Sequence, residues 1–351
     1  MSLIETQDEL NLLCDILSHQ EAFGIDTEFT KKSTYYPQLS LIQFGGKDYE
    51  YAVDLKQPLN FKGLEKILAN PKIIKIIHAA KQDLQGIKKF FNIDLKNVFD
   101  TQIAATFTGL GDHPSYGTLC EKLLDVKICK KTQFSNWEQR PLTEQQIVYA
   151  LIDVRHLTSV YEILYKKLTK QNRLEWFEEE MKNLEKTEDN KYLWVKYNQA
   201  PKSGKDYALL KDLLFWRMEI AKKNDIAPNL LVNNDIIVEL IENNNLINSE
   251  AFLKLNEGFK KELIDLFTLE PTLNDIEEFK KISALNSNQN LKSLLRQILL
   301  YIADKLNLPG YFIASKDDIF ITLLKGINET KIGKGWRYKV FGEVVQLILE
   351  K

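Results

Sequence analysis

The chain has 351 residues, of which 44% are hydrophobic and 27% are charged, and its formal net charge at pH 7 is −2. This length suits two or three domains, and the composition excludes a disordered or fibrous protein in favour of globular domains with ample core. The near-zero charge gives no global basic signature of a nucleic-acid-binding protein, although such binding depends on local clusters of charge.

The three cysteines, Cys14, Cys120 and Cys129, are widely spaced and form no C-x-x-C pair. They support neither a structural zinc site nor a disulfide framework, so we expect a reducing compartment. The N-terminal residues lack the basic and apolar regions of a signal peptide, and no apolar stretch reaches the length of a membrane span. We therefore expect a cytoplasmic protein with no membrane partner.

The first half of the chain alternates predicted strands and helices. In chain order we expect a helix at 5–20, strands at 23–29, 39–44 and 49–54, a helix at 61–69, a strand at 73–77, a helix at 81–90, a strand at 98–100 and a helix to about 107. Hairpin-type turns join the first three strands, which predicts an antiparallel meander. Helices join the later strands, which implies a parallel part of the sheet. The predicted class is therefore α/β with a mixed sheet.

Helical patterns fill the rest of the chain. One long amphipathic helix is expected over 142–169, and the polar stretch 186–206 is interpreted as a connector. Two later stretches repeat the order of amphipathic helix, Pro-containing turn, aliphatic patch and capped helix, which predicts a duplicated helical module. The expected domains are an α/β domain over 1–185, the connector, and small all-α domains over 207–280 and 285–351.

The strand at 23–29 carries two acidic residues on one face. Successive side chains of a strand point to opposite faces, so Asp26 and Glu28 lie side by side. Neighbouring carboxylates repel each other and lose hydration unless a cation compensates them. The alternative is an exposed edge strand whose polar residues face water.

Two further acidic positions follow along the chain. Asp83 falls in the first turn of the helix after the strand 73–77, where the helix dipole alone favours an acid. His78, at the end of that strand, also fits a hydrogen-bonded structural histidine. Tyr149 and Asp153 are spaced i, i+4 and share one helix face. A solvated aspartate beside a packed tyrosine is the alternative there.

Taken together, the four carboxylates predict a metal site. Asp26, Glu28, Asp83 and Asp153 would converge from three elements into one strongly negative pocket. Two divalent cations at a hard-oxygen site, Mg²⁺ or Mn²⁺, resolve that repulsion. Such ions, about 4 Å apart, serve in-line phosphodiester hydrolysis. Tyr149 would orient the attacking water.

These motifs resemble those of the bacterial ribonuclease D family, in the Tyr-type subgroup of the DEDD exonucleases, over residues 1–170. They are Asp26-Thr27-Glu28-Phe29 with Tyr35-Tyr36-Pro37-Gln38-Leu39, His78-Ala79 with Asp83-Leu84, and Tyr149-Ala150 with Asp153, the last preceded by Trp137 and Arg140-Pro141-Leu142-Thr143. The resemblance implies an RNase H-like fold, metal ligation by the four acids and positioning of water by Tyr149. It also implies a 3′→5′ exoribonuclease that releases nucleoside 5′-monophosphates, with tRNA precursors as its RNA.

The resemblance continues into the helical half. Leu213-Leu214-Phe215-Trp216-Arg217 and the Pro228-Asn229 turn are similar to an HRDC domain, and residues 335–342 are similar to the second HRDC-like domain of the family. The resemblance therefore implies an α/β RNase H-like catalytic domain with a mixed β-sheet, followed by two small all-α HRDC-like domains.

Two groups of residues are candidates for substrate binding. The group near the acidic strand comprises Thr27, Phe29, Tyr36, Gln38 and His78. The group near the C-terminus comprises Lys325, Lys334, Trp336 and Arg337. Residues 285–351 carry ten Lys or Arg and six Asp or Glu, a local net charge of +4. Cations and aromatic rings together suit single-stranded RNA, whereas core packing and solvated lysines are the alternative for both groups.

Two other functions stay open at this point. A 3′→5′ DNA exonuclease of the proofreading or helicase-associated kind would use the same acids, since only the 2′-OH separates the substrates. A non-catalytic RNA-binding protein would keep the fold without the chemistry. Because one chain carries every motif, a monomer is sufficient.

Overall fold

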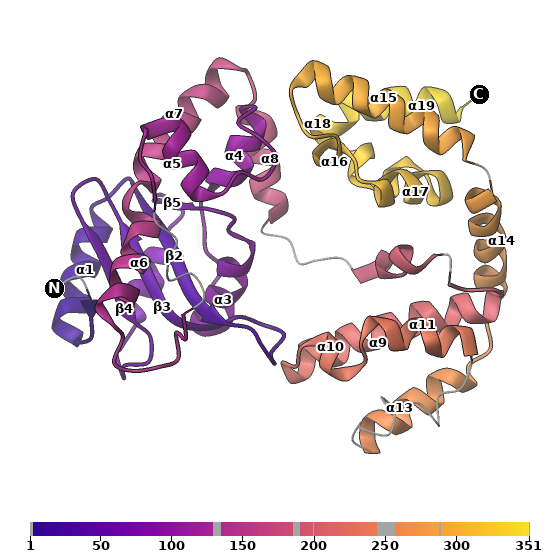
Figure 1. Ribbon diagram of the computed structural model, residues 1–351, viewed down its shortest axis with the longest axis horizontal. Coiled ribbons are helices and arrows are strands. Elements are labelled where there is room, and N and C mark those ends of the chain that lie inside the picture. The colour runs from indigo at the N-terminus through magenta and orange to yellow at the C-terminus, as the bar shows by residue number, and fades with distance from the viewer. Residues whose placement is uncertain are drawn as a thin grey trace. The chain divides into compact units, whose positions relative to one another are not determined.

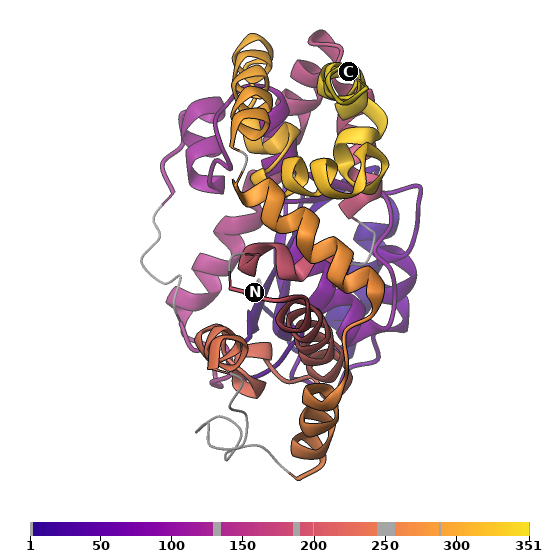
Figure 2. The ribbon, with the colours of Figure 1, turned by 90° about the vertical axis from the view of Figure 1, so that its right-hand side faces the viewer.

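The computed structural model describes residues 3–128, 135–184, 190–198, 200–243, 257–287 and 289–350. The chain forms two compact units, one of Met1–Lys32 with Tyr36–Thr187 and the other of Ser33–Tyr35 with Glu188–Lys351. Among the described residues, strands occur only in the first unit and the second is built from helices (Figure 1 and Figure 2). Cys14 and Cys120 are free cysteines, and Cys129 falls outside the described ranges. No helix within those ranges combines the length and the apolar character that crossing a bilayer requires.

The first unit is organised on a six-stranded mixed sheet with the order β1-β4-β3-β2-β5-β6. Its strands are β1 (Leu3–Ile4), β2 (Ala22–Thr30), β3 (Gln38–Gly45), β4 (Glu50–Asp54), β5 (Ile74–Ile77) and β6 (Val98–Asp100). The antiparallel meander predicted for β2, β3 and β4 is confirmed, and β5 and β6 extend the sheet in parallel. The short parallel β1 was not predicted.

Helices cover both faces of this sheet. The helices of this unit are α1 (Gln7–Ser18), α2 (Lys62–Leu68), α3 (Lys81–Phe91), α4 (Thr101–Phe107), α5 (Tyr116–Leu124), α6 (Glu144–Arg155), α7 (Leu157–Lys170) and α8 (Leu174–Leu184). Apolar residues of α1, α2 and α3 pack with Phe23 and Ile25 on one face of β2. Helix α6 covers the opposite face, where its Ala150 and Leu151 pack on β3 and β4. The acidic pair of β2 points to the α6 side, because it alternates with Ile25.

The single helix predicted over 142–169 is wrong, because α6 and α7 are separate helices that meet at His156. The hydroxyl of Tyr116, from α5, donates to the carbonyl of Ile152 (3.3 Å) and accepts the backbone N–H of His156 (2.9 Å). It thus replaces the hydrogen bond that would join these two groups in a continuous helix. The cause of the break lies 36 residues upstream of Ile152, so helical periodicity alone gives no sign of it.

Two glycines allow these helices to approach the sheet closely. A Cβ at Gly45 would lie 2.4 Å from the carbonyl oxygen of Val154, and one at Gly24 would lie 2.9 Å from the Cβ of Leu157. Both distances are too short for a real Cβ contact, so a side chain at either position would displace the helices. The glycines therefore set the distance between α6 and the acidic face of β2.

The second unit repeats one helical arrangement. Its elements are η1 (Asn190–Tyr197), α9 (Gly204–Asn224), α10 (Pro228–Leu231), α11 (Asn234–Asn243), α13 (Glu257–Thr268), α14 (Leu273–Ser287), α15 (Asn290–Leu306), α16 (Gly310–Ile313), α17 (Lys316–Lys325), η2 (Ile327–Glu329), η3 (Lys331–Gly333), α18 (Gly335–Arg337), η4 (Tyr338–Gly342) and α19 (Glu343–Leu349). The order α9, α10, α11 recurs as α15, α16, α17, as the repeated sequence pattern predicts. Helices α9 and α15 both end at a left-handed residue, Asp225 (φ 52°) and Asn307 (φ 49°).

One hydrophobic core runs through most of this unit. Trp194, in the middle of the predicted connector, is 3% exposed and packs in the same core as Leu213 of α9 and Phe320 of α17. Helix α14 runs without interruption through the predicted division near residues 280–285. The connector therefore contains a packed element, although its residues 186–189 and 199 lie outside the described ranges. The two predicted modules share a core because α14 packs against both α9 and α17.

Candidate active site

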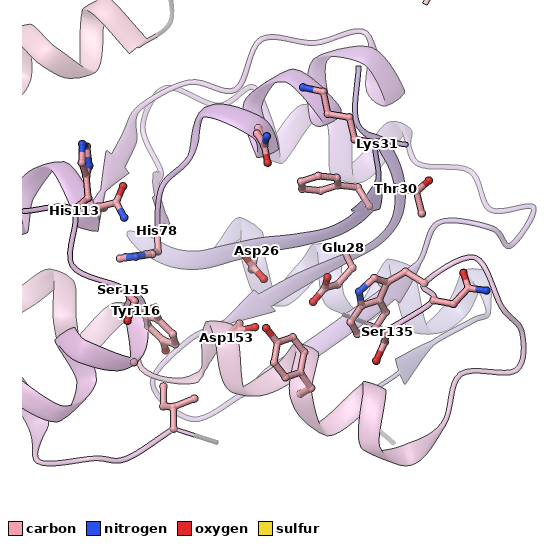
Figure 3. Close-up of a pocket in the computed structure, with 18 of the residues that line it drawn as sticks. Asp26, Glu28, Thr30, Lys31, His78, His113, Ser115, Tyr116, Ser135 and Asp153 are labelled. Carbon is pink, nitrogen blue, oxygen red and sulfur yellow. The ribbon is translucent and has the colours of Figure 1, made fainter. Parts of the chain in front are cut away.

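Three of the predicted ligands meet in a cavity between β2 and α6. One carboxylate oxygen each from Asp26, Glu28 and Asp153 lies within 4.8 Å of the other two. Asp26 and Glu28 reach the cavity from the strand and Asp153 faces them from the helix, as Figure 3 shows. The cavity has a volume of about 950 Å³. The predicted convergence of the strand motif and the helix motif is thus present in the fold.

These carboxyl groups stand in an environment that opposes their ionisation. Each keeps some surface open to the cavity, but surrounding protein excludes most solvent. Burial, followed by repulsion from Asp83, Asp153 and Glu28, raises the pKa of Asp26 well above its ordinary value. Burial and repulsion from Asp153 and Asp83 raise the pKa of Glu28 to about 9. Within the described part of the chain, no ion pair joins Asp26 or Glu28 to a lysine or arginine.

Asp83 lies beside this cluster but outside the group of three converging oxygens. It occupies the first turn of α3, as predicted, and its Oδ1 accepts a hydrogen bond of 2.5 Å from the Thr27 hydroxyl. Burial raises the pKa of Asp83 to about 7, although the bond from Thr27 acts in the opposite direction. Thr27 is itself only 5% exposed. Its side chain therefore orients Asp83, which favours a structural role over the predicted contact with substrate.

Asp100, which the sequence analysis did not single out, fixes the turn that precedes α3. Its buried carboxylate accepts four backbone N–H groups, those of Ala79 (3.2 Å), Ala80 (2.8 Å), Gln102 (2.8 Å) and Ile103 (3.3 Å). Ala79 is held in the left-handed region, with φ 60°, where a residue with a Cβ is strained. The available sequence signal was an aspartate at the N-cap position of the helix after β6.

Tyr149 occupies α6 one turn before Asp153 and lines the same cavity. Burial, then the negative charges of Asp153 and Glu28, raise the pKa of Tyr149 above its ordinary value. A hydrogen bond to Asp153 acts in the same direction. The ring of Trp137 lies 6.2 Å from the Tyr149 ring, measured between centroids. The phenol is therefore fixed on two sides and stays protonated at neutral pH.

The other predicted substrate residues near β2 differ in their access to the cavity. Phe29 and His78 line it, and the Nδ1 of His78 lies 2.9 Å from the Thr101 hydroxyl. Tyr36 and Gln38 are not among the described lining residues. Sequence reasoning missed the cations of the cavity wall and several polar groups beside them, which are Lys31, Lys32, Gln102, His113, Ser115 and Ser135. None of them belongs to a motif: Lys31 and Lys32 follow the first motif in sequence, Gln102 lies in α4, and the other three lie outside helices and strands.

Tyr36 and Gln38 make contacts of their own. The Lys89 ammonium lies 5.1 Å from the centroid of the Tyr36 ring. The side-chain amide of Gln38 donates to the Tyr36 carbonyl at 3.3 Å. Both residues are partly exposed. These contacts favour packing at the rim, the alternative interpretation, over an edge contact with the terminal nucleotide.

The structure packs Trp336 and Arg337 into the core, the alternative to their predicted contact with RNA. They are 2% and 4% exposed, and the Arg337 guanidinium lies 4.5 Å from the centroid of the Trp336 ring. The same guanidinium donates to the carbonyls of Phe312 and Ile313 in α16. It thus satisfies backbone groups at the end of a short helix, which is why a charged residue is tolerated in this core.

The two predicted lysines of the C-terminal group differ in the same way. The Nζ of Lys325 lies 2.7 Å from Oε1 of Glu278, whose side chain is 7% exposed. Lys325 therefore compensates a buried carboxylate within the second unit. Lys334 is exposed and keeps its place among the candidates for a phosphate contact.

Comparison with known proteins places these observations in a family. Residues 1–169 match a family model described as 3′-5′ exonuclease. The chain is 30% identical to ribonuclease D of Bartonella henselae over 369 residues, which cover 100% of this chain and 90% of the relative. It is 30% identical to ribonuclease D of Granulibacter bethesdensis over 97% of this chain and 91% of that protein. The crystal structure of Escherichia coli RNase D has a TM-score of 0.79 and 24% identity to this chain, covering 99% of it and 98% of that chain.

Proposed function

Because the chain belongs to the ribonuclease D family and is a 3′→5′ exoribonuclease, we propose that it trims single-stranded 3′ ends of RNA, tRNA precursors among them. In this proposal two divalent cations act at the acidic cluster, and nucleoside 5′-monophosphates are released. The observation that carries the proposal is the approach of the Asp26, Glu28 and Asp153 oxygens to within 4.8 Å of one another.

The donor set of this cluster fits Mg²⁺ or Mn²⁺. All its potential ligand atoms are carboxylate oxygens, which hard divalent cations prefer. Asp26, Glu28 and Asp153 would hold one cation, and Asp83 would contribute to the binding of a second. When bound, such ions lower the pKa of the attacking water and stabilise the oxyanion that departs.

The remaining residues of the cavity would orient the RNA and the water. Tyr149 stays protonated, so its hydroxyl can hold the attacking water in line with the scissile phosphodiester. Phe29 offers a ring against which the terminal base can pack. Lys31 and Lys32, both exposed at the cavity wall, would meet the phosphates of the preceding nucleotides.

A timed digest of an RNA with a single-stranded 3′ tail and a label at its 5′ end tests this proposal. With Mn²⁺ or Mg²⁺ we expect stepwise shortening from the 3′ end and release of nucleoside 5′-monophosphates, and EDTA should stop both. A matched DNA substrate should react more slowly. RNA that stays intact with either metal would support a non-catalytic RNA-binding protein instead, and faster degradation of the DNA would support a DNA exonuclease.

We further propose that the helical half, residues 207–280 and 285–351, consists of two HRDC-like modules that assist RNA binding. The recurrence of α9, α10 and α11 as α15, α16 and α17 supports this division, although the modules share one core. Lys334, exposed in the second module, is the predicted residue best placed for a phosphate contact. The proposal assigns the enzyme to the bacterial cytoplasm. It also assigns a monomer, since one chain carries every ligand of the site.

A further inference from the structure

The side chain of Gln43 in β3 is a buried polar group without a local role in the fold. It is 0% exposed, and within the described part of the chain neither its Nε2 nor its Oε1 has a hydrogen-bond partner. A buried amide that makes no hydrogen bond loses its hydration without compensation. Such groups are rare in native proteins, and an ordered water, an ion or a functional contact usually explains them.

The strand register places this amide against the acidic cluster. Gln43 lies directly opposite Asp26 of β2 on one side and Ala52 of β4 on the other. Opposed residues of an antiparallel pair point to the same face, with their Cβ atoms about 4.5–5.5 Å apart. Gln43 therefore shares with Asp26 the face that α6 covers. Leu41, Ala52 and Ala150, which belong to one hydrophobic cluster, lie on that face as well.

We propose that Gln43 is a positioning residue for the metal site, whose Nε2 donates a hydrogen bond to the Asp26 carboxylate when that carboxylate binds a divalent cation. The inference rests on the proposed metal-dependent function and deepens it. A carboxylate that binds a metal through one oxygen presents its other oxygen to a donor, and such a hydrogen bond fixes the orientation of the ligand. The strand opposite Asp26 supplies that donor.

The choice of residue type supports this role. Methionine has nearly the volume of glutamine and would fill the same space among Leu41, Ala52 and Ala150 without a polar group to desolvate. An amide at position 43 thus destabilises the metal-free protein relative to its apolar counterpart. The hydrogen bond to a metal-bound Asp26 offsets that loss only when the site is loaded.

An apolar residue at position 43 should stabilise the metal-free protein and weaken metal binding, and the experiment measures both effects. Wild type, Gln43→Met and Tyr49→Phe are compared by thermal unfolding without metal, by calorimetric titration with Mn²⁺ alone, and by RNA binding in EDTA. Tyr49 is the matched control because its hydroxyl also lacks a hydrogen-bond partner among the described residues but lines a different cavity. Gln43→Leu repeats the test with a second apolar side chain should Gln43→Met fail to fold.

We expect metal-free Gln43→Met to unfold at a higher temperature than wild type and to bind Mn²⁺ about 10–100-fold more weakly, the usual effect of losing a partner of a metal ligand. RNA binding in EDTA should not change. Tyr49→Phe should keep wild-type Mn²⁺ affinity. Unchanged Mn²⁺ affinity in the Gln43 variants would overturn the proposal, whatever their unfolding temperature. Failure of the wild type itself to bind Mn²⁺ would instead overturn the proposed function of the whole site.

Discussion

Both units of the chain contain buried carboxylates, but over the described ranges only in the helical unit does a lysine neutralise each of them. In the helical unit, Asp275 and Glu278 of α14 are buried, and each meets a lysine. Lys211 lies 2.5 Å from Asp275, and Lys325 lies 2.7 Å from Glu278. Burial alone would raise the pKa of Asp275, but hydrogen bonds from Lys211 and Thr272 outweigh it and lower that pKa. This cluster is electrostatically complete within the fold.

In the acidic cluster of β2 and α6, Asp26 and Glu28 have no such neutralising partner among the described residues. Its carboxyls raise one another's pKa values, and within the described residues no lysine or arginine forms an ion pair with Asp26 or Glu28. In the proposed function, this difference separates a structural cluster from one that cations from solution would neutralise. Substitutions in the two clusters should therefore have opposite effects on stability and activity.

Removal of one ligand carboxylate should have the largest effect on activity. Asp26→Asn or Asp153→Asn should lower kcat by at least about 10³-fold, because the loss of bound metal forfeits several kcal/mol of transition-state stabilisation. The same variants should unfold at a higher temperature than metal-free wild type, since one source of repulsion is gone. Single-turnover digestion of the 3′-tailed RNA and thermal unfolding without metal measure the two effects.

Glu278→Gln is the control in the other cluster. It should keep the wild-type rate at low temperature and lose stability, because Lys325 loses its partner. An Asp26→Asn enzyme that retains most of its activity would contradict the assignment of Asp26 as a metal ligand. A metal-free Asp26→Asn protein that is less stable than wild type would contradict the claim that repulsion destabilises this cluster.

Removal of the Tyr149 hydroxyl should have the next largest effect. Tyr149→Phe should lower kcat by about 10²-fold, within the range for a side chain that handles the attacking water. Its Mn²⁺ affinity should stay at the wild-type value, because the four carboxylates remain. Calorimetry and single-turnover kinetics on the same preparation separate the two quantities. A parallel loss of metal affinity would show that the phenol acts on Asp153 and has no role toward water.

The dependence of stability on pH should reveal the same cluster. A carboxyl whose pKa is raised by folding binds its proton more tightly in the folded state, so folding stability falls as pH rises. For Glu28, the loss of folding stability extends from about pH 4.5, its ordinary pKa, to about pH 9, its pKa in the folded protein. A pKa that differs by one between the folded and unfolded protein corresponds to about 1.4 kcal/mol of stability. The unfolding temperature of metal-free protein should therefore decrease between about pH 5 and pH 8.

Mn²⁺ should abolish most of that decrease by compensating the ionised carboxylates. Glu28→Gln should make the decrease smaller without metal but not remove it, because burial still raises the pKa values of Asp26 and Asp83. A metal-free protein whose unfolding temperature is flat or rises over this interval would show that these carboxyls ionise without cost in the fold.

The smallest effect concerns Lys325. Lys325→Met should lower the free energy of unfolding by about 1–3 kcal/mol, because Glu278 is left buried without a partner while the lysine site itself is partly solvated. RNA affinity should not change, since Lys325 is engaged in the ion pair. Chemical denaturation and an RNA-binding titration measure the two quantities. Weaker RNA binding by Lys325→Met but not by Glu278→Gln would restore Lys325 as a phosphate contact.

Much of this arrangement can be predicted from the sequence because it depends on local patterns. Alternation places Asp26 and Glu28 on one face of β2, and helical spacing places Tyr149 beside Asp153. The break at His156 depends on the hydroxyl of Tyr116, which a local pattern does not include.

Contacts between distant segments explain the remaining misses. The hydrogen bond from the Thr27 hydroxyl to Asp83 joins residues 56 positions apart. Trp336 and Arg337 are residue types that are common on nucleic-acid-binding surfaces. Here the Arg337 guanidinium is buried instead, because it donates hydrogen bonds to carbonyls of α16. Composition alone cannot distinguish these two outcomes, because the same residue types serve both.

The central claim is that the acidic cluster is completed by divalent cations. Anomalous diffraction from crystals grown with Mn²⁺ tests it most directly. The account predicts two anomalous peaks, one within coordinating distance of Asp26, Glu28 and Asp153 and a second near Asp26 and Asp83. The absence of manganese between β2 and α6 at a saturating concentration, with ordered carboxylates around the vacant position, would contradict it.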